Sequence, residues 1–62
     1  MLATTIKRLR KRRKLTQQGL AVRAGLTLGY IARLEIGMHD PRLGTLRKLA
    51  KALGVPATEL LK

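Results

Sequence analysis

The amino-acid sequence predicts an all-α fold, a compact bundle of five short helices around one leucine-rich core. Apolar residues recur at the three- and four-residue spacing of helices along the whole chain. Strand-type alternation is missing, and β-branched residues are few. Glycine, threonine and proline residues divide the helical pattern into short segments. The expected helices span residues 3–13, 17–24, 28–35, 43–53 and 57–61.

The first expected helix carries its apolar residues Leu2, Ile6 and Leu9 at positions i, i+4 and i+7. It is also strongly basic. Seven of the fourteen lysines and arginines lie within the first fourteen residues: Lys7, Arg8, Arg10, Lys11, Arg12, Arg13 and Lys14.

Threonines that suit N-caps precede the second and third expected helices. Thr16 comes before the second helix, and Gly25 follows it as a C-terminal stop. Thr27 comes before the third helix. The expected buried face of the second helix is Leu20, Ala21 and Ala24, and the apolar face of the third is Tyr30, Ile31 and Leu34.

The last two expected helices follow a turn-like segment that Pro41 closes. Gly54 ends the fourth helix, and Pro56 suits the first turn of a short fifth one. The apolar positions of the fourth helix are Leu43, Leu46, Leu49, Ala50 and Leu53.

Size and charge limit the kind of protein this can be. A chain of 62 residues predicts one domain, over residues 1–62, and the absence of cysteine excludes disulfides and thiolate metal sites. The net charge of +11 favours a polyanionic partner, either nucleic acid or an anionic membrane surface. No apolar run approaches the ~20 residues that cross a bilayer, and no apolar segment follows the basic start as in a secretory signal. Cytoplasm is therefore the expected location.

The stretch AVRAGLTLGYIARLE predicts two short helices that meet at a sharp corner. Helices that cross steeply come close together near the middle of the first one, where the small Ala21 fits. Gly25 adopts the positive φ that the turn needs without steric cost. The helix from residue 28 is then held outward, where it can enter a DNA major groove.

At this point the sequence resembles the phage-repressor, or Xre/Cro-type, family of helix-turn-helix domains. The segments IKRLRKRRKLTQQGLA, AGLTLGYIARLEIG and DPRLGTLRKLAKALGV carry the resemblance, which extends from about Ile6 to Leu61. It implies a lambda-repressor-like fold and a DNA-binding transcriptional regulator, specifically a repressor, that recognises a specific sequence of double-stranded DNA in the major groove with its third helix. It also implies a homodimer on a two-fold site, for which Leu60, Leu61 and the loop before the fourth helix could supply the contact.

The resemblance also assigns roles to single residues. Arg33 is the best candidate for holding guanine O6 and N7, while Leu28 either touches a thymine methyl group or has no role. Gly29 adds no side-chain contact but lets backbone approach DNA closely. Expected base contacts are Thr27, Leu28, Gly29 and Arg33. Expected phosphate contacts are Gln17, Gln18, Tyr30, Arg42, His39, Arg13 and Lys14.

Arg10 and Glu35 match family positions that form an ion pair between the first and third helices. Breaking such a pair costs of order 3 kcal/mol if it is well buried. Arg10 could also face phosphate. Relatives often carry glycine where Lys14 stands, so the first helix is expected to end in a less comfortable turn.

Other functions are less consistent with the sequence. The three acids are not spaced for joint catalysis, so an enzyme is not expected. His39 has no second ligand at helical spacing, so neither a metal nor another cofactor or small-molecule ligand is expected. The basic first helix could bind anionic lipid. Within the family, an antitoxin or a DNA-targeting module of a larger protein remains an alternative to a repressor.

Overall fold

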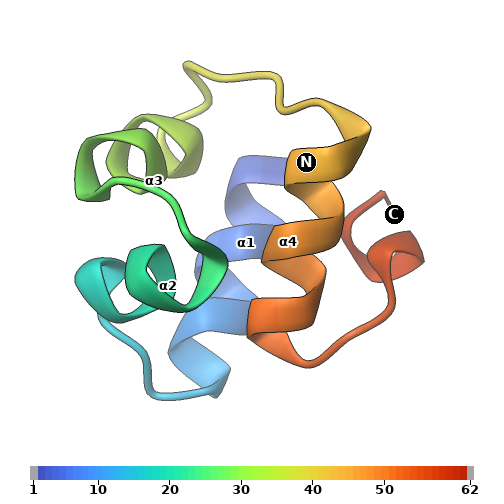
Figure 1. Ribbon diagram of the computed structural model, residues 1–62, viewed down its shortest axis with the longest axis horizontal. Helices are drawn as coiled ribbons and strands as arrows, with labels where there is room; N and C mark the ends of the chain where they lie inside the picture. The colour runs from blue at the N-terminus through green and yellow to red at the C-terminus, as the bar shows by residue number, and fades with distance from the viewer. Residues whose placement is uncertain (1, 62) are drawn as a thin grey trace.

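Figure 1 shows the computed structural model of the protein, which describes residues 2–61. Residues 1 and 62, the ends of the expected domain, lie outside the described residues. Four α-helices are followed by one 3₁₀ turn, and no strand occurs within residues 2–61, so the all-α prediction is confirmed. The elements are α1 (Leu2–Arg12), α2 (Gln17–Ala24), α3 (Leu28–Glu35), α4 (Leu43–Leu53) and η1 (Ala57–Leu60).

The structure differs from the expected helices at both ends of the chain. α1 begins and ends one residue before the expected 3–13. The expected fifth α-helix is a 3₁₀ turn of four residues that ends at Leu60. A segment this short is held by i→i+3 bonds, such as the one from Glu59 N to Pro56 O at 2.9 Å. Pro56 lies just before the turn, in extended backbone.

Every element contributes to a single apolar core. α2 packs against both α3 and α4, α1 packs against α3, and η1 packs against α4 and α1. In Figure 1, α2 and α3 lie on one side of the bundle and η1 lies on the other. Each helix is too short to be stable alone, so its folding depends on this packing. The largest fully buried side chains are Ile6, Leu20, Ile31, Leu34, Leu49, Leu53 and Leu60.

The connection from α1 to α2 contains a residue in an unfavourable backbone conformation. Lys14 has a φ of 58°, the only positive φ outside glycine among residues 2–61. Its N–H donates to Lys11 O at 2.9 Å, and Leu15 N donates to Arg10 O at 3.1 Å. A side chain in this left-handed region costs roughly 1–2 kcal/mol through the clash of Cβ with backbone.

Replacing Lys14 with glycine is therefore expected to stabilise the protein. The relief of strain is partly offset by the greater freedom of glycine in the unfolded chain, so the net gain is about 0.5–1 kcal/mol. Urea unfolding at pH 7 measures it. Lys11→Gly, inside α1, is the matched control and should cost about 1 kcal/mol. Equal losses from both substitutions would contradict the strain assigned to Lys14.

Candidate nucleic-acid interface

Two threonine N-caps and one glycine set the ends of α2 and α3. Thr16 Oγ1 accepts a hydrogen bond from Gly19 N at 2.9 Å, and Thr27 Oγ1 accepts one from Tyr30 N at 3.1 Å. Gly25 ends α2 with a φ of 69°. Gly25 and the Thr27 cap end α2 and start α3 within three residues, which fixes the direction of α3.

α3 is buried on one side only. Ile31 and Leu34 are in the core, whereas the four residues expected to contact bases are all exposed. Leu28, the first residue of α3, leaves 46% of its surface exposed. The outer face of α3 is thus free to meet a partner. The exposed set is Thr27, Leu28, Gly29 and Arg33.

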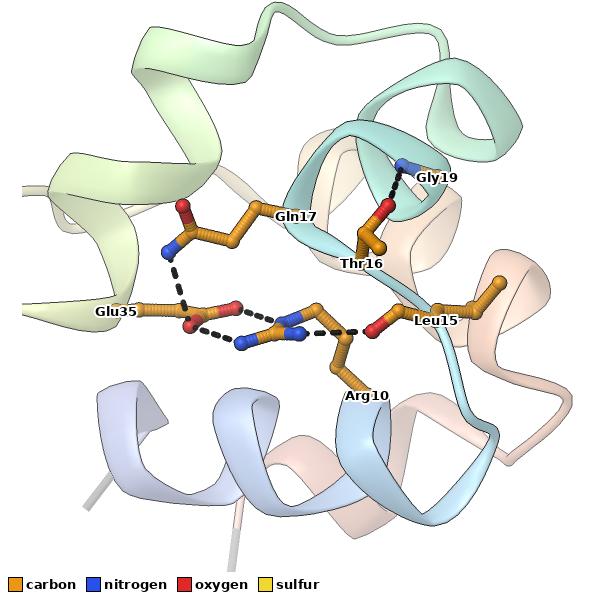
Figure 2. A network of polar contacts seen from close by, with 6 residues as sticks. All are labelled: Arg10, Leu15, Thr16, Gln17, Gly19 and Glu35. Atoms are coloured by element: carbon orange, nitrogen blue, oxygen red, sulfur yellow. Dashed lines mark hydrogen bonds and ion pairs between the residues drawn. The ribbon is translucent and has the colours of Figure 1, made fainter.

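One polar network links the start of α2 to the end of α3 (Figure 2). The guanidinium of Arg10 donates from Nε to Glu35 Oε2 at 2.6 Å and from a terminal nitrogen to Oε1 at 3.0 Å. Its other terminal nitrogen donates to Leu15 O at 2.7 Å. Gln17 Nε2 donates to Glu35 Oε1 at 3.2 Å. The network joins α1, the α1–α2 connection, α2 and α3.

Burial makes this network structurally important. The side chains of Arg10 and Glu35 are 11% and 2% exposed. The structure thus brings together the pair expected from the sequence. Arg10 uses its guanidinium on protein groups, which argues for its structural role over a phosphate contact. The hydrogen bond from Gln17 to Glu35 was not expected, because the sequence gave Gln17 only a role in contacting DNA phosphate. Its backbone N–H, in the first turn of α2, has no partner within a helix.

The charge state of Glu35 follows from its surroundings. Burial acts to raise the pKa of this carboxyl, but hydrogen bonds from Arg10 and Gln17 lower it. The positive charges of Arg10 and Lys7 act in the same direction, so the pKa of Glu35 lies below its ordinary value. The hydrogen bond to Glu35 raises the pKa of Arg10, although burial opposes it. The pair is therefore ionised at neutral pH.

The aromatic ring of Tyr30 has a partner that the sequence did not reveal. It stacks on the ring of His39, with centroids 4.5 Å apart and planes 11° apart. The stack ties the loop between α3 and α4 back to α3. Both residues were expected to contact DNA phosphate, and the stack places their side chains next to each other. Arg42, in the same category, is exposed at the N-cap of α4.

The basic residue Arg13, just after α1, contacts the C-terminal end of α4. Arg13 donates to the carbonyl of Gly54, the residue that ends α4, at 3.2 Å. A cation at this end of a helix is favoured by the helix dipole. The structure therefore gives Arg13 a role in the fold that its assignment to phosphate did not anticipate. Lys14 and Gln18 are exposed.

Further cations surround a hollow between α2 and α4. Arg23 and Lys51 stand in the last turns of these helices, where the dipole favours them, and Lys48 lies one turn before Lys51. Ala24 and Ala52 complete the lining of the hollow. Positive charge is thus not restricted to the outer face of α3.

Two alternative kinds of site find no support in residues 2–61. No group of three or more histidine, cysteine, aspartate or glutamate residues there could hold a metal ion. None of the helices within that range has the length and apolar character to span a membrane. The apolar side of α1, which would have to meet lipid in a membrane-binding peptide, is occupied by the core, since Ile6 and Leu9 are buried.

Two short capped helices meet at a tight turn in which Gly25 has left-handed backbone, and the second helix has a free outer face. This arrangement defines a helix-turn-helix domain. Residues 6–60 match the family model described as helix-turn-helix (HTH_3). The chain belongs to this family, the Xre/Cro-type helix-turn-helix domains of DNA-binding transcriptional regulators, which are not enzymes. The resemblance identified from the sequence is confirmed.

Known proteins similar to this chain include a phage repressor and two solved regulators. The immunity repressor of Bacillus phage phi105 is 43% identical over 56 residues, or 90% of this chain, and the match spans 39% of the repressor's length. The restriction-modification controller C.AhdI of Aeromonas hydrophila superposes with a TM-score of 0.92 at 32% identity, covering 95% of this chain and 89% of C.AhdI. SinR, the master regulator for biofilm formation, was solved in complex with DNA. It superposes with a TM-score of 0.95 at 28% identity over the whole of both chains.

Proposed function

We propose that residues 1–62 form one DNA-binding domain of a transcriptional repressor that recognises a specific duplex in the cytoplasm. The outer face of α3 enters the major groove, which is wide enough for a helix. The observation that carries this proposal is the half-buried α3, whose exposed side holds Leu28 and Arg33 while Ile31 and Leu34 anchor it. The similarity to SinR, which was solved with DNA, supports it.

Phosphate contacts in this proposal surround α3. The first N–H groups of α2, at Gln17 and Gln18, attract an anion because they lack helical partners and carry partial positive charge. Arg42 begins α4 beside the loop that holds the stack of Tyr30 and His39. Lys14 adds attraction that depends little on sequence.

Two copies of the chain are proposed to bind a two-fold site with half-sites about one helical turn apart. One expected contact residue is excluded, because Leu60 is 1% exposed and belongs to the core. Leu61 is exposed, as are Ile36 and Met38 between α3 and α4. We assign the contact between copies to these exposed apolar side chains, which lie after η1 and after α3.

Selection of binding sites from random duplexes, followed by salt titration, tests the function. We expect a recurring motif with two-fold symmetry and an affinity that falls steeply between about 50 and 200 mM salt. Arg42→Gln should weaken binding to all sequences and reduce the salt slope by about one.

Lys51→Gln is the matched control for Arg42→Gln. This substitution also removes one positive charge from α4, but Lys51 lies in the last turn, at the opposite end from the N-cap Arg42. It should change the salt slope much less. No recurring motif, or binding indifferent to salt, would contradict the proposed function. A motif without symmetry would contradict only the two-copy arrangement.

A further inference from the structure

The guanidinium of Arg33 lies over Gly29, one turn earlier in α3. A Cβ atom placed on Gly29 would come within 3.3 Å of a terminal nitrogen of Arg33 and within 3.9 Å of its Cζ. Helical side chains lean toward the N-terminus, and residues four apart share a face. Arg33 therefore occupies the space that a side chain at residue 29 would otherwise fill.

We propose that Gly29 is a specificity-determining residue because its missing side chain provides a seat for Arg33. The open space at Gly29 lets the guanidinium lie beside the first turn of α3, the part of a recognition helix that faces base edges. Arg33 then reads a guanine at the level of residue 29, in place of the absent side chain. This inference rests on the proposed function and adds that Gly29 and Arg33 together determine one base contact.

The chemistry of Arg33 fits this role. It is exposed, and within residues 2–61 its guanidinium enters no hydrogen bond or ion pair. Its N–H groups remain available, in contrast to those of Arg10, which are used on Glu35 and Leu15. A guanidinium donates two parallel hydrogen bonds to guanine O6 and N7. With no side chain at residue 29, the guanidinium reaches that position without displacing another group.

The chain provides a matched control glycine. Gly44 is the second residue of α4, as Gly29 is the second residue of α3. A Cβ on Gly44 meets nothing within 4 Å. The same substitution at the two positions changes helix propensity alike, but only at Gly29 does it fill the seat of Arg33.

The test compares Gly29→Leu, Gly44→Leu, Arg33→Ala and the double variant Gly29→Leu/Arg33→Ala. Binding-site selection on the wild-type protein first identifies the guanine that Arg33→Ala no longer prefers. Dissociation constants are then measured for this site and for the same site with adenine in place of that guanine. Circular dichroism checks that each variant is folded.

We expect the wild-type protein to prefer guanine by about tenfold, as a good bidentate contact does. Gly29→Leu should reduce this ratio to near one at that position only, and Gly44→Leu should leave it unchanged. The double variant should show the same ratio as Arg33→Ala, because both changes remove one contact. If Gly29→Leu binds no duplex, Gly29→Ala decides, since its single added carbon should lower the ratio in the same direction.

Three results would overturn the inference. Gly29→Leu could keep the guanine preference that Arg33→Ala loses, which would exclude the seat. If Gly29→Leu binds no duplex, an unchanged guanine-to-adenine ratio in Gly29→Ala would likewise exclude the seat. Arg33→Ala could weaken binding to all duplexes equally, which would make Arg33 a phosphate contact and leave the proposed function intact. Failure of the wild-type protein to select any motif is distinguishable from these, because it would contradict the proposed function itself.

Discussion

Replacing Arg10 with methionine is expected to lower the free energy of unfolding by about 3 kcal/mol at pH 7. The methionine keeps much of the packing volume but leaves the carboxylate of Glu35, whose side chain is 2% exposed, with Gln17 as its remaining hydrogen-bond donor. It also removes the donor that satisfies Leu15 O. For a domain of this size the loss corresponds to a fall of roughly 12–24 °C in Tm.

Two further variants separate the cause from general damage to α1. Arg8→Met removes an exposed arginine from the same helix and should change stability by less than about 0.5 kcal/mol. Arg10→Met/Glu35→Met removes both charges and should recover much of the loss, because an apolar pair can replace a buried ion pair at little cost. A loss below about 1 kcal/mol for Arg10→Met would mean that the pair behaves like an exposed one.

The dependence on pH provides a second check on the same network. Because the pKa of Glu35 is lowered on folding, its ionisation stabilises the folded state. This contribution is fully present above about pH 4.3, where glutamate titrates in an unfolded chain, and is lost as the pH falls through the lowered folded value. The stability difference between the wild-type protein and Arg10→Met should therefore shrink on acidification. A difference constant down to pH 2 would contradict the assignment to Glu35.

Local signals in the sequence were sufficient to predict the bounds of α2, α3 and α4, but not the 3₁₀ geometry of η1. Thr16 and Thr27 form the caps expected of them, and Gly25 has the expected left-handed conformation. Each of these features depends on residues within four positions of one another, so residue type largely decides it. The ion pair of Arg10 and Glu35 joins residues far apart, and only the resemblance to a family provided it.

The remaining contacts depend on tertiary packing, which local patterns do not contain. Arg13 meets the Gly54 carbonyl 41 residues away, where the end of α1 reaches the end of α4. The Tyr30–His39 stack depends on how the loop after α3 folds back. At the C-terminus two adjacent leucines offered two choices for the core. The 3₁₀ geometry of η1 turns Leu60 inward and leaves Leu61 exposed.

The crossing of α2 and α3 should be equally sensitive to a single residue. Ala21, in the middle of α2, is 1% exposed, and α2 packs directly against α3. Ala21→Leu adds three carbons at this buried position, where the sequence predicts that the two helices come close, and overpacking at such a site costs about 1–3 kcal/mol. Thermal and urea unfolding measure the loss. The exposed surface of α3 should also shift, so affinity for the selected duplex should fall even at temperatures where the variant remains folded.

Val22→Leu is the control, because Val22 is the next residue in α2 and is 68% exposed. It adds one carbon to the solvent side of the same helix and should change stability and DNA affinity little. If Ala21→Leu were tolerated as well as Val22→Leu, the helices could not meet at Ala21. The angle at which α3 leaves the bundle would then have another cause. Since that angle decides whether α3 reaches the major groove, this comparison tests the physical link between the corner at Gly25 and recognition of DNA.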